Sequence, residues 1–116
     1  MDAKEFAKNW VEAWNSHDMN EILHHYTDDF EITTPMIKMA LGIDTGTLKG
    51  KEAIADYWSK ALEKMPDLKF ELYDVTKSVN SIALYYQSVM NKRSIEVMFF
   101  NEEGLITKVI AHYTDI

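Results

Sequence analysis

The hydrophobic positions in the first 65 residues recur at the spacing of amphipathic helices. Three stretches, residues 2–14, 18–26 and 51–65, place apolar side chains three or four positions apart, so that these side chains share one side of a helix. The first two stretches open with an aspartate followed three residues later by a glutamate, which is the pattern of a capping box. Pro66 follows the third stretch and ends it. The pattern therefore predicts three helices.

A short strand and an ambiguous segment separate the second and third predicted helices. Residues 27–29 indicate a turn, and residues 30–34 alternate between apolar and polar side chains up to Pro35, which predicts a strand. Residues 36–49 combine apolar side chains with Gly42 and Gly46, which indicates a loop or a single helical turn. An apolar loop must cover something or be covered. A lid over a pocket and ordinary packing are the two alternatives for this segment.

The sequence after Pro66 changes to the composition and alternation of strands. Four stretches are rich in β-branched and aromatic residues, namely residues 68–77, 82–90, 94–100 and 105–114. The polar links between them are too short for crossover connections, so they predict an antiparallel meander. Three helices and a short strand followed by four paired strands make an α+β fold in which the helices pack on a sheet.

Each predicted strand presents two faces, because side chains alternate along it. We assign one face to Ala83, Tyr85, Gln87, Ser94, Glu96, Met98 and Phe100. We assign the other face to Ile82, Leu84, Tyr86, Ile95, Val97 and Phe99. Both sets are largely apolar, whereas a sheet with one face in water shows a cleaner polar alternation. The helices of so small a chain can cover only one face, so the second face needs a partner.

The simplest partner for the second face is another copy of the chain. We therefore predict a homodimer through the outer face of the sheet, centred on Tyr86, Ile95, Val97, Phe99, Ile110 and His112. An exposed apolar patch of this extent is unusual on a monomer.

Composition and charge exclude several classes of function. The chain has 116 residues and no internal repeat or linker, which predicts a single domain over residues 1–116. Its net charge of -7 argues against nucleic-acid binding. The absence of cysteine excludes disulfides, thiolate zinc sites and cysteine nucleophiles, and fits a reducing cytoplasm. The N-terminus does not have the pattern of a signal peptide, and no stretch approaches the ~20 apolar residues of a membrane span. We expect a cytoplasmic protein without membrane contact.

Four segments resemble a known family. They are WVEAWNSHDMNEILHHYTDDFEITTP (residues 10–35), GTLKGKEAIADYW (46–58), PDLKFELYDV (66–75) and FFNEEGLITKVIAHY (99–113). In these segments the chain is similar to SnoaL-like polyketide cyclases, within the nuclear transport factor two-like superfamily that also contains ketosteroid isomerases. The resemblance implies a cone: a curved antiparallel sheet and three helices that enclose an apolar pocket. It also implies dimerisation through the outer sheet face, in agreement with the pattern of the strands.

The resemblance does not carry over the catalytic residues of two known activities. A ketosteroid isomerase has a carboxylate base where this chain has Thr34, and a tyrosine in the first helix where it has Trp10. Its third position, a protonated aspartic acid, corresponds to Glu96. Ketosteroid isomerisation is therefore not expected, since a hydroxyl is no base near neutral pH. A limonene epoxide hydrolase uses an Asp-Arg-Asp network, whereas Arg93 is the only arginine here and adjoins a turn.

The candidate pocket is aromatic with a few polar groups, as expected for a site that binds a hydrophobic small molecule. Its predicted members are Trp10, Trp14, Thr34, Tyr57, Trp58, Tyr85, Gln87, Glu96, Met98 and Tyr113. No cofactor is expected. No metal site is expected either, because the adjacent His24 and His25 point in different directions and make a poor pair of ligands.

Two functions remain open for this pocket. The first is a non-catalytic module that binds an apolar ligand. The second is an acid–base enzyme, similar to a cyclase or isomerase, that uses Glu96 on a carbonyl compound. Both predict that Glu96 points into the cone, where apolar surroundings raise its pKa. We predict Gln87 as the neighbour across the strand that orients this carboxyl.

Overall fold

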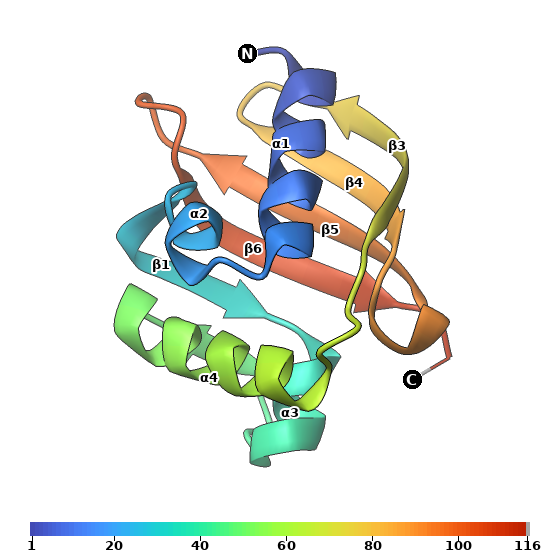
Figure 1. The fold of residues 1–116 in the computed structure, drawn as a ribbon. Helices are drawn as coiled ribbons and strands as arrows, with labels where there is room; N and C mark the ends of the chain where they lie inside the picture. Colours follow the sequence, from blue (N-terminus) through green and yellow to red (C-terminus); the bar gives the residue numbers. More distant parts are fainter. Residues whose placement is uncertain (116) are drawn as a thin grey trace.

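The sheet has six strands in the order β2-β1-β6-β5-β4-β3, and the helices lie against one of its faces (Figure 1). The structure is a computed structural model and describes residues 1–115. The helices are α1 (Ala3–Ser16), α2 (Met19–Leu23), α3 (Pro35–Leu41) and α4 (Lys51–Lys64), with a short 3-10 turn η1 (Val89–Asn91). The strands are β1 (Tyr26–Thr33), β2 (Thr47–Lys49), β3 (Glu71–Lys77), β4 (Ser81–Gln87), β5 (Arg93–Phe100) and β6 (Ile106–Tyr113). This curved, open α+β architecture is the predicted fold class.

The first two helices begin at the predicted caps. The Asp2 carboxylate accepts a hydrogen bond from the backbone N–H of Glu5 at 3.1 Å, and the Asp18 carboxylate accepts from Asn20 and Glu21 at 3.0 and 3.4 Å. These bonds satisfy N–H groups that the first turn of a helix leaves unpaired. The apolar stripe of α1 is buried against the sheet, as its spacing predicts.

The last four strands form the predicted antiparallel meander, but the first strand adds a feature that the pattern does not contain. β1 pairs with β6 in parallel, so the sheet is mixed. β1 also begins at Tyr26, four residues earlier than predicted, and residues 27–29 lie within it rather than in a turn. A register shift between Tyr26 and Glu31 accommodates these polar residues. Such an irregularity disturbs the alternation on which the prediction rests.

Residues 36–49 are neither a loop nor a single turn. Thr34 caps α3 by accepting from the backbone N–H of Met36, Pro35 occupies the first turn, and Gly42 ends the helix in the left-handed region. β2 follows and pairs with β1. Ile37 is buried in the core, whereas Met39 and Leu41 are exposed, so the segment is packed only in part and the choice between a lid and ordinary packing stays a prediction. The glycines that favoured a loop mark the end of a helix and the start of a strand.

The pairing of β4 with β5 corrects the predicted faces of the sheet. Leu84 lies opposite Glu96, and Tyr86 lies opposite Ser94. The even-numbered residues of both strands therefore share the inner face, which we define as the face that α1, α2 and α4 cover. Tyr85 and Gln87 lie on the outer face instead. Alternation assigns the residues of each strand to two faces. The length of the turn between two strands decides which face of the first strand continues into which face of the second. Here η1 shifts the pairing of β4 with β5 by one residue from the predicted register.

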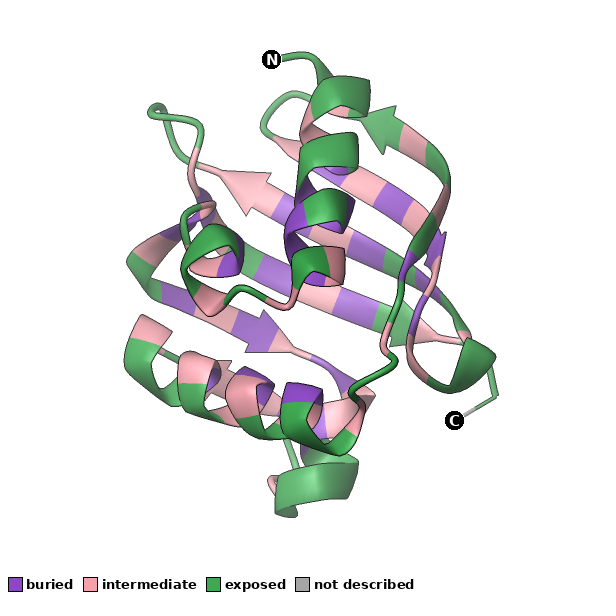
Figure 2. Cartoon of the chain, in the orientation of Figure 1, coloured by how far each residue is buried: buried purple, intermediate pink, exposed green. Residues whose placement is uncertain are grey.

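The core lies between the inner face and the helices. Figure 2 shows buried segments along the middle strands and on the sides of α1 and α4 that face them. The largest buried side chains are aromatic: Trp10, Trp14, Tyr26, Phe30, Trp58, Phe70 and Tyr86. The outer face is only half-buried, and its apolar side chains have no covering element among residues 1–115.

Candidate functional site

Glu96 is the buried carboxyl group of the interior. It lies on the inner face of β5, between Leu84 of β4 and Ala111 of β6, and only 5% of its surface is exposed. The Tyr86 hydroxyl donates a hydrogen bond of 2.6 Å to its Oε1. No other group of residues 1–115 hydrogen-bonds to this carboxyl. The predicted location of Glu96 inside the fold is confirmed, whereas its predicted neighbour Gln87 is replaced by Tyr86.

Burial makes Glu96 a group that titrates near neutral pH. Desolvation raises its pKa from the ordinary value of 4.5 to about 7, against the opposing effect of the Tyr86 hydrogen bond. The carboxyl is therefore present in both protonation states around pH 7. In the neutral form it can donate a hydrogen bond, and in the charged form it can only accept.

Tyr86 and Tyr26 keep their protons next to this carboxyl. Burial, together with the charge of Glu96, raises the pKa of each hydroxyl well above the ordinary value of 10. Trp10 Nε1 donates a hydrogen bond of 2.9 Å to the Tyr26 hydroxyl, so α1 and β1 are joined inside the core. The two hydroxyls therefore stay protonated and do not act as bases: Tyr86 donates to Glu96, whereas Tyr26 accepts from Trp10.

Three buried polar atoms near this cluster have no hydrogen-bond partner among residues 1–115: Trp14 Nε1, Ser88 Oγ and Ser94 Oγ. Each lies near a tyrosine hydroxyl, which is that of Tyr26, Tyr113 and Tyr86 respectively. A buried polar atom without a partner loses about 1–3 kcal/mol of hydration, so native proteins rarely leave one unmatched. Water or ligand oxygens are the groups that fit such positions.

Polarity changes along the inner face. The row of Ile82, Met98 and Val109 is wholly apolar and buried. The next row contains Glu96 between Leu84 and Ala111, and the row beyond it contains Tyr86, Ser94 and Tyr113. The interior is therefore apolar toward the turns at Ser78–Asn80 and polar toward η1.

Most of the predicted pocket residues lie on the inner side of the fold. Trp10, Trp14, Thr34, Trp58 and Met98 are buried, while Tyr57 and Tyr113 are half-buried. The Thr34 hydroxyl is engaged in capping α3. Burial raises the pKa of Tyr113 to about 12, and the charge of Glu96 adds to this effect.

Tyr85 and Gln87 are the two predicted pocket residues that the structure places elsewhere. Both lie on the outer face, because the register pairs them with Ile95 and Arg93. Gln87 accepts a hydrogen bond from the Tyr73 hydroxyl at 2.9 Å and donates one to Asn91 at 3.1 Å, so it does not orient Glu96.

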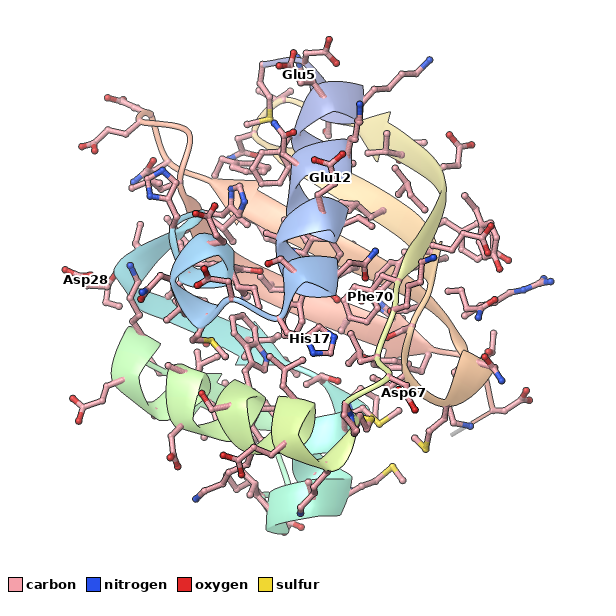
Figure 3. All side chains as sticks on the ribbon, in the orientation of Figure 1. Glu5, Glu12, His17, Asp28, Asp67 and Phe70 are labelled. Carbon is pink, nitrogen blue, oxygen red and sulfur yellow. The ribbon has the colours of Figure 1, made fainter. Side chains whose placement is uncertain are left out.

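Much of the interior is filled by the aromatic side chains themselves. The Trp10 ring stacks on Phe70 with centroids 5.6 Å apart, and Trp14 meets Trp58 edge-on at 4.9 Å. Phe70, which precedes β3, lies beside the end of α1 near His17 (Figure 3). Neither Phe70 nor the tyrosines 26 and 86 were among the predicted site residues. Assigning the even-numbered residues of β4 to the inner face would have placed Tyr86 beside Glu96. Tyr26 was missed because the pattern around it resembled the end of a helix.

An open groove adjoins the polar end of the interior. Its volume is about 670 Å³, and its walls are residues 64–71 and 87–91, including Phe70 and Ser88. A second groove, of about 710 Å³, lies at the other end of the sheet between Lys77–Ile82 and Phe100–Gly104. Glu96 lines neither groove.

Residues 1–115 contain no cluster of three or more histidine, aspartate or glutamate side chains with the geometry of a metal site. None of their helices is both long and apolar enough to cross a bilayer.

Comparison with known proteins places this site in context. A model of the SnoaL-like domain matches residues 7–109. A SnoaL-like protein of unknown function from Burkholderia thailandensis is 39% identical, with a TM-score of 0.93 over 96% of this chain and 92% of the other. No curated protein matches significantly.

Two more distant structures share the fold. A putative isomerase of the SnoaL-like family from Agrobacterium tumefaciens is 18% identical, with a TM-score of 0.75 over 96% of each chain. The epoxide hydrolase/cyclase-like enzyme SalBIII, with a role in pyran ring formation in the polyether salinomycin, is 17% identical. Its TM-score is 0.73 over 97% of this chain and 90% of the other. At these identities the likeness concerns the fold alone.

Proposed function

The chain belongs to the SnoaL-like domain family, and we propose that it binds a small, largely apolar molecule through a carbonyl or hydroxyl oxygen held by Glu96. The observation that carries this proposal is the carboxyl itself, which is buried in an aromatic interior with one hydrogen-bond partner, Tyr86. Its second oxygen is free of protein partners among residues 1–115. A carboxyl in such a place is unfavourable for stability unless a ligand or solvent group meets it.

The chemistry of the ligand follows from the surroundings of Glu96. Neutral Glu96 can donate to a carbonyl oxygen, and charged Glu96 can accept from a hydroxyl. The tryptophan and phenylalanine rings around it favour an apolar and preferably aromatic body. Since those rings pack against one another, binding requires that some of them turn aside.

A second candidate function is acid–base catalysis on a carbonyl compound, and the pKa of Glu96 favours it. A group with a pKa of about 7 is well matched to proton transfer at neutral pH. Tyr86, which hydrogen-bonds to the same carboxyl, would hold it in place. Among residues 1–115 no second carboxylate is buried with it, and the position just before Pro35 is Thr34. Glu96 would therefore act as both acid and base.

Binding can be tested with ketones of three classes: a steroid ketone, an aromatic polyketide and the terpenoid carvone. We expect at least one class to raise the melting temperature of the wild-type protein and to give a dissociation constant by calorimetry. Glu96→Leu removes both oxygens and should weaken that binding at least tenfold, whereas Glu12→Gln, on the exposed side of α1 and away from both grooves, should leave it unchanged. Equal binding by the wild type and Glu96→Leu would overturn the proposal.

Glu96→Gln separates the two functions. An amide keeps the size of the side chain and a hydrogen-bond donor, but it cannot exchange a proton. A binding protein should keep its affinity within severalfold. An enzyme should lose most of its turnover of the bound ketone, measured by loss of substrate or by exchange of its α-protons with deuterium.

We also propose that the protein is a homodimer through the outer face of the sheet. The face carries Ile95, which is 46% exposed, and half-buried Val97, Phe99 and Ile110, so it is apolar along β5 and at Ile110 of β6. Lys108 and His112, on either side of Ile110, are its exposed polar residues on β6. Tyr86, predicted as part of this surface, belongs to the inner face and is removed from it, and Tyr85 takes its place. A second copy offers the same apolar patch, as a two-fold symmetric interface requires.

A further inference from the structure

The groove at the polar end of the interior contains a buried hydroxyl that points to a ligand. Ser88 lies on the wall of this groove, only 4% of its surface is exposed, and its Oγ has no partner among residues 1–115. The hydroxyl of half-buried Tyr113 lies close to it. A ligand oxygen that reaches this pair of hydroxyls would satisfy Ser88, and the groove borders the residue, so a small movement of the side chains that cover the Oγ atom would connect the two.

Ser88 is the first member of a line of polar groups that leads inward. Ser94, 1% exposed and also without a partner, lies beside Tyr86 and Tyr113 in the next row of the inner face. Glu96 follows one row further. Residues two apart on a strand are separated by ~7 Å, so the line extends over roughly 13 Å from the groove to the carboxyl.

We propose that this groove is the entrance to the interior and that Ser88 and Tyr113 form a second oxygen-binding position at its inner wall. The ligand is then an apolar molecule with two oxygen functions, one held by Glu96 and the other, roughly 7 to 13 Å away, held by Ser88. This inference rests on the proposed binding at Glu96 and adds the route of entry and the second oxygen.

Both walls of the groove are held in place from behind. On one side, the Asn15 side chain donates to the Phe70 carbonyl at 3.0 Å and accepts from its backbone N–H at 2.7 Å, while His17 Nε2 lies 2.8 Å from the Leu68 carbonyl oxygen. On the other side, Met90 and Asn91 have φ angles of 55° and 59°, in a region that non-glycine residues rarely occupy. An opening with two defined walls is suited to admitting a ligand of defined shape.

The second oxygen position is tested with two probes that differ by one hydroxyl. Raspberry ketone has a ketone and a phenol hydroxyl at opposite ends of the molecule, and benzylacetone lacks the hydroxyl. For the wild type we expect raspberry ketone to bind roughly three- to tenfold more tightly, as one hydrogen bond predicts. Ser88→Ala should abolish this preference and leave the affinity for benzylacetone unchanged. An undiminished preference in Ser88→Ala would overturn the assignment.

The entrance is tested by blocking it. The chain has no cysteine, so a single introduced cysteine can be labelled selectively with a bulky maleimide. A label on Met90→Cys, at the groove, should weaken or slow the binding of benzylacetone at least tenfold. The same label on Val79→Cys, at a 98% exposed position beside the other groove, should leave binding within twofold of the unlabelled protein. Equal effects of the two labels would overturn the entrance.

The two proposals can fail separately. If Glu96→Leu weakens the binding of benzylacetone but Ser88→Ala and the Met90 label change nothing, the ligand reaches Glu96 by another route and only the further inference fails. If neither probe binds the wild type and the three ketone classes also fail, the proposed function fails, and the second oxygen position is refuted with it.

Discussion

The two faces of β5 differ in polarity, and the difference is the reverse of that in most strands, which bury apolar residues and expose polar ones. The buried side carries Ser94 and Glu96, whereas the side without a covering element carries Ile95, Val97 and Phe99. A strand selected only for folding would show the reverse arrangement, with polar residues in water. The inner face thus keeps polar groups at a cost in stability, and the outer face keeps apolar groups at a cost in solubility. Each departure supports one of the two proposed partners, a small molecule inside and a second chain outside.

Inserting a carboxylate into each face is the strongest test of this difference. Leu84→Glu would place a second acid directly opposite Glu96 in the core, and we expect it to reduce the free energy of unfolding by about 4 kcal/mol or more. Ala83→Glu, one residue away on the outer face, should change the unfolding free energy of the isolated chain by less than about 1 kcal/mol. Urea unfolding followed by circular dichroism measures both. Similar losses would mean that the two faces are not distinct.

The next largest effect is expected in the pH dependence of the unfolding free energy, which should report the burial of Glu96. Unfolding returns Glu96 to its ordinary pKa of 4.5, against about 7 in the folded state. Below pH 4.5 the group is neutral in both states and folding is not penalised. Between pH 4.5 and 7 the unfolded state ionises first, so stability falls as the pH rises. At about 1.4 kcal/mol per pKa unit, the loss is about 3 kcal/mol and is complete above pH 7.

Glu96→Gln serves as the reference for this measurement. The amide does not titrate, so the difference in unfolding free energy between the variant and the wild type should grow by about 3 kcal/mol from pH 4.5 to pH 8. Urea titrations at four or five pH values determine that difference. A difference that does not change with pH would place Glu96 in contact with solvent and contradict its burial.

The smallest effect on stability is expected at the outer face, where the readout is the assembly. Val97→Lys should leave the unfolding free energy of the isolated chain within about 0.5 kcal/mol, because the side chain is not in the core. It should nevertheless convert a dimer into a monomer of 13.5 kDa in light scattering. Val79→Lys introduces the same charge at an exposed turn and should remain dimeric. A wild-type mass of 13.5 kDa at micromolar concentration would refute the dimer.

The sequence predicted those parts of the fold that depend on local periodicity. The caps at Asp2 and Asp18 and the stripe of α1 follow from the order of residues within one element, and the four-strand meander follows from the short links between neighbouring strands. The parallel pairing of β1 with β6 and the helix α3 do not, since they depend on contacts between distant residues or on glycines with two possible roles.

The candidate site was predicted in part for the same reason. Glu96 and the tryptophans of α1 were identified because each lies on an unambiguous side of its own element. Tyr85 and Gln87 were assigned to the wrong face and Tyr86 was overlooked, because a one-residue difference in register inverts a whole strand. The unpaired hydroxyls of Ser88 and Ser94 are not visible in a sequence, since serine is common in turns and edge positions and only the structure shows what surrounds it.

The strand order has a consequence for how the molecule forms. β6, the last strand in sequence, lies between β1 and β5 in the middle of the sheet. During synthesis β1 can pair with β2 early, but its other edge stays open until residues 106–113 have left the ribosome. Contacts between such distant segments slow folding, and an open edge invites pairing with other chains. Nascent chains that stall before residue 106 should therefore require chaperones. In the complete fold β6 pairs with both β1 and β5, so these strand edges are no longer open.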